Sequence, residues 1–443
     1  MGEPLRAWVD EGPDGLSGVR TVAPSHALWH AIEQQLAGDR RACARELVQF
    51  LLDERPALRL LDRALRAASG TRLPADFAVA NAMRCYARVD VSGQEGGVLA
   101  CALRPNEVRA IGRLRGALPG AAWSDVTFDL GRGLARGLAG APVRALPRLA
   151  AIARRLWRGH EPAAALRAVE LIAYYARFSE LLASGRYRVA AMSTYTNPWG
   201  LALHAAARRH GIPVVLAAHG MPVWPVARLD YDLAIVDSAA SRDMFIRAGC
   251  QLDRVVLESA RAAHRPLPRA LPDRPLVIGV LLSKEPGPAV VPWLDGLLAR
   301  PDIGQLVVRP HPASVWRGLE RALARYPRDR VVLGTGRSCA EDLARVDFAI
   351  AGNSSVHVEA LVRGTPAIFV PELDATTDDS YGLIASGLVV VQRSPAHVRF
   401  ERVLRAYDQP RWRRVLARYA NLDDTAADVT ARLRAEFASL GVA

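Results

Sequence analysis

The stretch 188–219 has the sequence RVAAMSTYTNPWGLALHAAARRHGIPVVLAAH. It opens with a short apolar run at 188–193, continues through a helical segment at 199–210 and closes with a second apolar run at 213–219. A strand, a helix and a strand within about thirty residues form a βαβ unit, in which both strands lie parallel in one sheet. The chain is therefore predicted to belong to the α/β class.

The same alternation continues on both sides of this unit. Apolar runs at 97–103, 126–130, 231–237 and 254–257 extend the first sheet. After a proline-rich stretch at 262–274, further runs lie at 276–282, 305–309, 331–333, 348–351 and 367–370. We therefore expect two Rossmann-like domains that face each other, with ligands bound between the carboxyl ends of their strands.

Four parts are expected along the chain. These are a helical N-terminal region at 1–90, a Rossmann-like acceptor domain at 91–265, a Rossmann-like nucleotide-donor domain at 275–395, and C-terminal helices at 396–443 that pack back on the N-terminal domain. His26 and His30 lie one helical turn apart in the first part. With no third ligand in view, an ordinary helix surface explains them better than a metal site.

Composition restricts the classes of protein that fit. Of 443 residues, 50% are hydrophobic and 23% are charged, which excludes a disordered chain and a coiled coil. No apolar run approaches the roughly 18 residues of a membrane-spanning helix, and residues 1–15 lack a signal pattern. The five cysteines are scattered and form no zinc motif. A cytoplasmic protein with reduced thiols is expected.

The net charge of +13 comes almost entirely from arginine, because Lys284 is the only lysine. Between Asp129 and Glu161 no acidic residue occurs, and arginines alternate with apolar residues from Arg132 to Arg158. Such a segment can lie on an anionic membrane surface, although a solvated linker has the same composition. No motif for binding nucleic acid accompanies the charge, so no nucleic-acid partner is expected.

The motif His219-Gly220-Met221-Pro222 closes the apolar run at 213–219. A histidine at the carboxyl end of a strand projects into the expected cleft, and its pKa near 6.5 suits a general base that takes a proton from a hydroxyl. The alternative is a turn histidine with a satisfied hydrogen bond.

The motif Arg309-Pro310-His311-Pro312 ends the run at 305–309. A guanidinium binds phosphate through two hydrogen bonds, and a neutral histidine donates one more. An anion site is therefore predicted at Arg309 and His311. A rigid turn with an exposed cation is the competing interpretation.

The third motif, Asn353-Ser354-Ser355, follows the run at 348–351 and opens a helix that carries Glu359. Serine at a helix start is usually an N-cap, but the same amides and hydroxyls also suit a phosphate. Ser354 and Ser355 are therefore candidate phosphate ligands, and Glu359 is a candidate for a ribose hydroxyl.

Two further polar positions follow predicted strands. Lys284 follows the run at 276–282 and is a candidate phosphate contact or a solvated loop end. Thr194 and Asn197 follow the run at 188–193 and are candidates for the acceptor side, although an ordinary polar loop explains them equally well.

In their order and spacing, these motifs resemble the glycosyltransferase-B (GT-B) superfamily. The likeness is greatest to its branch of CDP-glycerol glycerophosphotransferases and of capsule polysaccharide transferases of the sialyl and Kdo types. It rests on HGMP at 219–222, RPHP at 309–312 and VDFAIAGNSSVHVEALVRGTP at 346–366, and it covers roughly 185–395. The chain departs from the branch by having Gly352-Asn353 and His219 where acidic residues are usual.

The resemblance implies that His219 is the general base and that Arg309, His311, Ser354 and Ser355 bind the donor phosphate. A GT-B enzyme would move a sugar, or a polyol-phosphate, from a nucleotide-activated donor of the CMP or CDP type to a surface polysaccharide or lipid-linked glycan. No cofactor or metal is expected, because cationic side chains can neutralise the leaving group. The alternatives are a sugar-nucleotide epimerase of the same fold and a non-catalytic scaffold for glycan assembly at a membrane surface.

Overall fold

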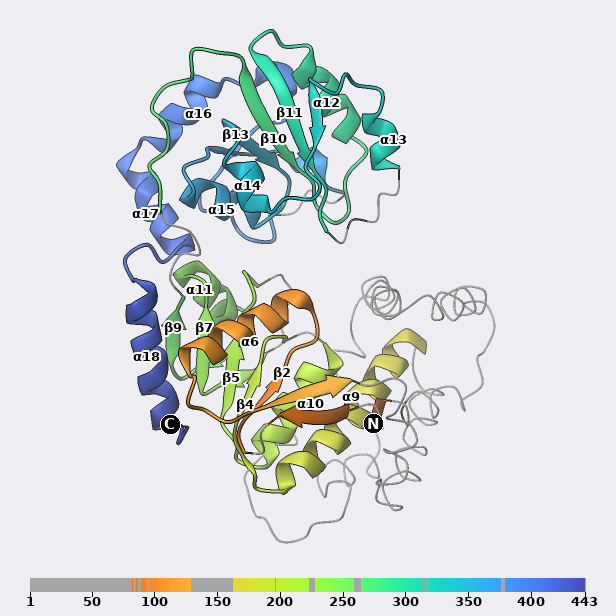
Figure 1. Ribbon diagram of the computed structural model, residues 1–443, viewed down its shortest axis with the longest axis vertical. Coiled ribbons are helices and arrows are strands. Elements are labelled where there is room, and N and C mark those ends of the chain that lie inside the picture. Colours follow the sequence, from red (N-terminus) through yellow and green to blue (C-terminus); the bar gives the residue numbers. More distant parts are fainter. Residues whose placement is uncertain are drawn as a thin grey trace.

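The computed structural model describes residues 82, 85–86, 89–93, 96–128, 162–195, 197–222, 228–258, 264–312, 314, 318–375 and 379–442. For residues 162–167 only the backbone is described. Most of the expected helical region at 1–90, including His26 and His30, lies outside these residues. The basic segment from Arg132 to Arg158 also lies outside them. The described part forms two α/β halves, one above the other in Figure 1.

The N-terminal half contains a seven-stranded sheet in the order β1-β3-β2-β4-β5-β7-β9. Its strands are β1 (Val89–Gly93), β2 (Gly97–Cys101), β3 (Trp123–Phe128), β4 (Tyr187–Met192), β5 (Val214–Ala217), β7 (Leu233–Val236) and β9 (Val255–Leu257). Only the pairing of β1 with β3 is antiparallel. The short strands β6 (Asp230–Tyr231) and β8 (Gln251–Leu252) form a separate parallel pair.

The strands of this sheet are apolar because helices cover both faces. Along β4, Ala190 and Met192 belong to one buried cluster, whereas Val189 and Ala191 belong to another. The first cluster includes helices α9 (Pro162–Ala183) and α10 (Pro198–Arg209). The second includes α6 (Pro105–Ala117) and the C-terminal α18 (Ala426–Ser439). This burial on both faces explains the unbroken hydrophobic runs in the sequence.

The C-terminal half contains a parallel six-stranded sheet in the order β12-β11-β10-β13-β14-β15. Its strands are β10 (Leu276–Leu281), β11 (Ile303–Arg309), β12 (Val331–Leu333), β13 (Phe348–Ala351), β14 (Ala367–Phe369) and β15 (Val390–Val391). Its helices are α12 (Val290–Leu298), α13 (Leu319–Leu323), α14 (Cys339–Leu343) and α15 (Val356–Val362), with 3₁₀ turns η2 (Pro371–Leu373) and η3 (Pro395–His397). The predicted α/β class with two Rossmann-like domains is confirmed.

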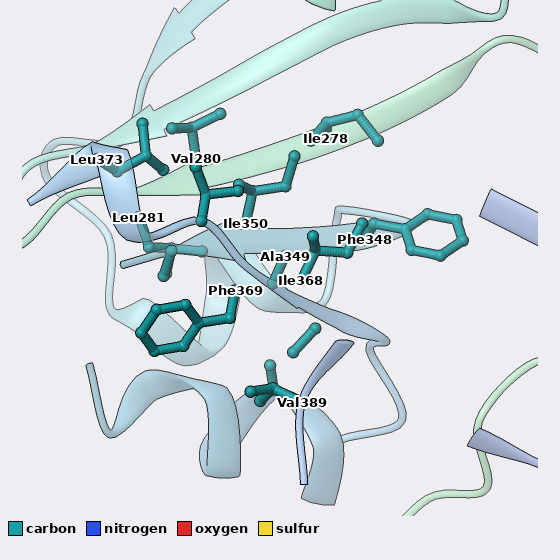
Figure 2. Packing of buried hydrophobic residues seen from close by; sticks show 14 of the residues in the cluster. Ile278, Val280, Leu281, Phe348, Ala349, Ile350, Ile368, Phe369, Leu373 and Val389 are labelled. Atoms are coloured by element: carbon teal, nitrogen blue, oxygen red, sulfur yellow. The ribbon is translucent and has the colours of Figure 1, made fainter. Parts of the chain in front are cut away.

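One buried cluster holds the C-terminal sheet together. Figure 2 shows side chains of β10, β13 and β14 packed against one another, with Leu373 and Val389 beside them. Each of these side chains is at most 6% exposed. Fully burying a large apolar side chain contributes about 1.5–3 kcal/mol, so this cluster fixes the positions of the strand ends that carry the polar loops.

Three helices follow the second sheet, namely α16 (Phe400–Tyr407), α17 (Pro410–Tyr419) and α18. Helix α17 contacts α11 (Ala239–Arg247) of the N-terminal half, where Arg418 Nη2 lies 2.7 Å from Asp243 Oδ2. A capping box between Thr425 and Asp428 begins α18, which then runs beside the N-terminal half (Figure 1). Helix α17 therefore contacts both halves, and α18 packs on the N-terminal half.

No helix in the described part of the chain is both long and apolar enough to cross a membrane.

Candidate functional site

The polar loops of the C-terminal half lie at one edge of its sheet. In the parallel ladders, Leu281 at the end of β10 pairs with Arg309 of β11 on one side and with Ala351 of β13 on the other. These three strands therefore end in one row, with neighbouring strands about 4.8 Å apart. The loops that carry Lys284, His311 and Ser354 consequently begin side by side, and Lys284 follows the middle strand.

Lys284 and His311 lie close together at this edge. His311 is exposed and Lys284 is half-buried. Partial desolvation, and then repulsion from the Lys284 ammonium group, lower the pKa of the His311 imidazole below its usual 6.5. A neutral imidazole retains an N–H group that can donate to an anion. The structure therefore brings these two predicted phosphate contacts together.

Arg309 has a different environment. Its Nη1 atom lies 2.6 Å from Oδ2 of Asp342, and it donates to the carbonyl oxygens of Arg337 at 2.9 Å and Gly334 at 3.3 Å. The Asp342 side chain is 4% exposed and that of Arg309 is 17% exposed. The guanidinium that the sequence assigned to phosphate is therefore engaged in a buried ion pair.

The loop after β13 leads into α15, which has seven residues. Ser354 Oγ accepts a hydrogen bond from the Val356 amide at 3.3 Å. Ser355 occupies the N-cap position with helical backbone angles, and its side chain makes no capping hydrogen bond. Ser355 is exposed, and the hydrogen bond to the first turn comes from the neighbouring Ser354.

Glu359 lies on α15, with its Oε1 atom 3.1 Å from Nε of Arg363, one turn further along. Its side chain is 40% exposed. An exposed pair of this kind contributes little to stability. The interpretation of Glu359 as a ribose contact stays a prediction.

Asp374, which the sequence analysis missed, connects the loops at this edge. It follows η2, is 8% exposed, and accepts a hydrogen bond from the Asn353 amide. A Cβ atom on Gly352 would lie 2.6 Å from Asp374 Oδ1, so the carboxylate packs directly on that glycine. Pro286, two residues after Lys284, forms a β-bridge with Asp374. Burial raises the pKa of Asp374, against the opposing hydrogen bonds from Ser283 and Asn353.

His357 holds the same loop through a hydrogen bond to its backbone. It is fully buried on α15, and its Nε2–H group donates to the carbonyl oxygen of Gly352 at 2.8 Å. Burial lowers the pKa of His357 to about 4, against the opposing backbone hydrogen bonds. The imidazole is therefore neutral near pH 7, and its ring stacks on Phe369 of β14.

In the N-terminal half, His219 lies two residues beyond β5. Its Nδ1 atom is 2.8 Å from the carbonyl oxygen of Ser193, which follows the neighbouring strand β4. A carbonyl oxygen only accepts, so Nδ1 carries the proton and the lone pair of the neutral ring is on Nε2. The ring is half-buried. This tautomer is the one that a general base acting through Nε2 requires.

Thr194 and Asn197 are bound to each other. Asn197 Nδ2 donates to Thr194 Oγ1 at 3.0 Å. Asn197 is 6% exposed and Thr194 is 2% exposed. Gly200 lies against Thr194, with no space for a Cβ atom. Both side chains are therefore buried next to Ser193, and their predicted contacts with the acceptor stay a prediction.

The two carboxyl edges face each other. Met221, two residues after His219, is 6% exposed and belongs to the buried cluster of the C-terminal half. Burial raises the pKa of Tyr381 most, and the nearby carboxylates of Asp374 and Asp237 raise it further. Asp237 follows β7 in the N-terminal sheet, whereas Asp374 follows β14 in the other. Tyr381 therefore lies within electrostatic reach of both edges.

Within the described ranges, no three His, Cys, Asp or Glu side chains gather closely enough to hold a metal ion.

The two functional candidates that sequence reasoning missed are both buried aspartates. Asp342 lies in the first turn of α14 as part of CAEDL, where an acidic residue is ordinary. Asp374 lies in PELDATTDD, among other acids. Their pairing with Arg309 and with the Asn353 amide is not visible in any local pattern.

No protein-family model and no curated protein matches this chain. Among solved structures, it is similar to the calicheamicin glycosyltransferase CalG4, with 14% identity, a TM-score of 0.45, and 78% of this chain and 98% of that chain covered. It is also similar to MurG of Acinetobacter baumannii, with 14% identity, a TM-score of 0.39, and coverage of 77% and 99%. UDP-GlcNAc 2-epimerase of Neisseria meningitidis has 11% identity, a TM-score of 0.45, and coverage of 78% and 100%. Since all three TM-scores lie below 0.5, the fold class rests on the strand order and register of this chain.

Proposed function

We propose that this chain is a GT-B glycosyltransferase that binds a nucleotide-activated donor along the carboxyl edge of its C-terminal sheet. The observation that carries the proposal is the common register of β11, β10 and β13, because it starts three polar loops side by side. Lys284, His311 and Ser354 follow these strands. Ligands of open parallel sheets bind at such an edge.

The chemistry follows from the two facing edges. His219 Nε2 accepts the proton of an acceptor hydroxyl while its oxygen forms the new bond to the donor sugar. The bond from the sugar to the donor phosphate breaks, and the negative charge of the departing nucleotide is stabilised by the cationic and amide-bearing loops of the opposite edge. Protein cations take the place of a divalent metal in this scheme.

A CMP or CDP donor and a surface polysaccharide or lipid-linked acceptor are favoured by the resemblance of the three motifs. Contact of the basic segment from Arg132 to Arg158 with the inner face of a membrane would bring the enzyme to such an acceptor.

The first test is a thermal-shift screen of the full chain with CMP, CDP, UDP, ADP and GDP. A ligand that binds only the folded protein raises the melting temperature. We expect at least one cytidine or uridine nucleotide to do so at millimolar concentration. If none of the five stabilises the protein, the enzyme is excluded and the scaffold alternative is favoured.

The second test separates transfer from epimerisation. The chain is incubated with the sugar nucleotide of the best-binding base, with and without a glycan acceptor, and followed by NMR. We expect consumption that depends on the acceptor. Conversion to the epimer without any acceptor would instead identify a sugar-nucleotide epimerase.

A further inference from the structure

We propose that Lys284 supplies the positive charge of the donor-phosphate site, and that Arg309 and Asp342 form a neutral pair that positions the loop carrying His311. This inference rests on the proposed function, because it divides the roles within that site. It changes the expectation from the sequence, in which Arg309 was one of the phosphate ligands.

The first observation is the direction of Arg309. Strand β11 has β12 on one side and β10, followed by β13, on the other. The hydrogen bonds of Arg309 all go to the segment that follows β12, namely to Gly334, Arg337 and Asp342. Its Cβ atom also lies beside Gly334. The guanidinium is thus bound on the side of β11 opposite to the loops of β10 and β13.

The second observation is the charge balance of this pair. Oδ2 of Asp342 lies 2.6 Å from Arg309 Nη1, and the position of Gly334 leaves no space for a Cβ atom beside that oxygen. A buried ion pair presents a dipole to its surroundings and not a net charge. A phosphate at the strand ends therefore gains little from Arg309. The pair instead fixes the end of β11, and His311 follows that end by two residues.

The third observation is the environment of Lys284. It follows β10, the strand between those that lead to His311 and to Ser354. No carboxylate of a described residue forms a salt bridge with its ammonium group. The pKa of His311 is lowered first by its partial burial and then by repulsion from this ammonium group. An ammonium group without a carboxylate partner, next to the loops of His311 and Ser354, is an arrangement suited to a phosphate.

The test measures binding of the nucleoside diphosphate that gives the largest thermal shift, by isothermal titration calorimetry on the full chain. Lys284→Gln should weaken binding at least tenfold, and Lys284→Arg should stay within about threefold of the unchanged protein. The double variant Arg309→Gln/Asp342→Asn removes both charges of the pair and keeps polar groups of similar shape. Because the pair positions the loop carrying His311, this variant should lose some affinity, but clearly less than Lys284→Gln, and its melting temperature should be lower.

The sole lysine allows a measurement that does not depend on any variant. An amine-selective acylating reagent modifies only Lys284 and the N-terminal amine. Saturating nucleoside diphosphate should slow acylation of Lys284 at least fivefold, as measured by mass spectrometry, whereas the nucleoside alone should not. Acylation of the N-terminal amine is the internal control.

The outcomes separate the two proposals. If the unchanged protein binds no nucleotide, the proposed function fails and this inference fails with it. If the nucleotide binds but leaves Lys284 equally reactive, the inference alone is wrong. The same holds if the folded double variant loses as much affinity as Lys284→Gln.

Discussion

Nδ1 of His219 lies 2.8 Å from the carbonyl oxygen of Ser193, so the histidine that follows β5 is held by the backbone that follows the neighbouring strand β4. Ser193 is fully buried, and its strand β4 is in register with β5, through the pair Met192 and Leu216. The ring orientation and tautomer of His219 are therefore set by two adjacent strands of a rigid sheet. This gives the first prediction.

His219→Ala should lower kcat by a factor of 10² or more, because general-base catalysis contributes typically 10²–10⁴-fold. Nucleotide affinity should change less than threefold, since the proposed donor site lies on the other half. Steady-state kinetics and calorimetry measure the two quantities. His397→Ala, at an exposed histidine of η3, is the matched control and should alter neither. Equal loss of binding and turnover would contradict the assigned role.

Met221 gives the second prediction, because it joins the loop of His219 to the buried cluster of the C-terminal half. Met221→Ala removes that contact and should lower kcat while nucleotide affinity is retained. Met221→Leu, which conserves volume, should restore most of the rate. Unchanged turnover in a folded Met221→Ala protein would mean that this contact does not position the base.

Gly352 gives the third prediction. A methyl group there would meet the carboxylate of Asp374, and overpacking of this kind costs about 1–3 kcal/mol. Gly352→Ala should therefore lower the melting temperature and weaken nucleotide binding, since the Asn353 amide is displaced. Gly116→Ala is the control, because that glycine lies on a helix with open space around it and the change should be neutral or stabilising. Wild-type stability and binding of Gly352→Ala would refute the close contact.

The fourth prediction concerns stability against pH. Burial lowers the pKa of His204 and of His357 from 6.5 to about 4. The unfolded chain therefore binds these protons at a higher pH than the folded chain, so stability is full above about pH 6.5 and falls as the pH drops toward 4. Each histidine should account for a loss on the order of 2 kcal/mol at pH 5.

Urea unfolding at pH 7.5 and pH 5.0 measures this loss. His204→Gln should remove part of the pH dependence in the N-terminal half, and His357→Gln should do so in the C-terminal half. His397→Gln should leave it unchanged. A pH dependence that is identical in all three variants would show that other groups cause it.

Much of the strand pattern was predictable because buried parallel strands are apolar throughout. The run at 348–351 is β13, and those at 331–333 and 276–282 match β12 and β10 within a residue. The strands β1, β6, β8 and β15 were missed as separate strands. Three of these have two residues each, and β1 alternates polar with apolar positions, so none has the continuous apolar run that marks the others.

The candidate site was predictable in part for the same reason. The carboxyl ends of parallel strands meet at one edge, so residues just beyond apolar runs become neighbours without any knowledge of the crossovers. This explains why the sequence alone places the loops of Lys284, His311 and Ser354 at one edge of the sheet.

The linear order of residues thus established the α/β class, the two sheets and the loops at their carboxyl ends, because these depend on local periodicity and on the geometry of parallel strands. Which charges remain available at that edge was settled only by three-dimensional contacts. Arg309 pairs with Asp342, 33 positions later, and the Asn353 amide pairs with Asp374. Electrostatic interaction depends on separation and burial in space, and a guanidinium that looks available in the sequence loses its net charge once a distant carboxylate is folded against it.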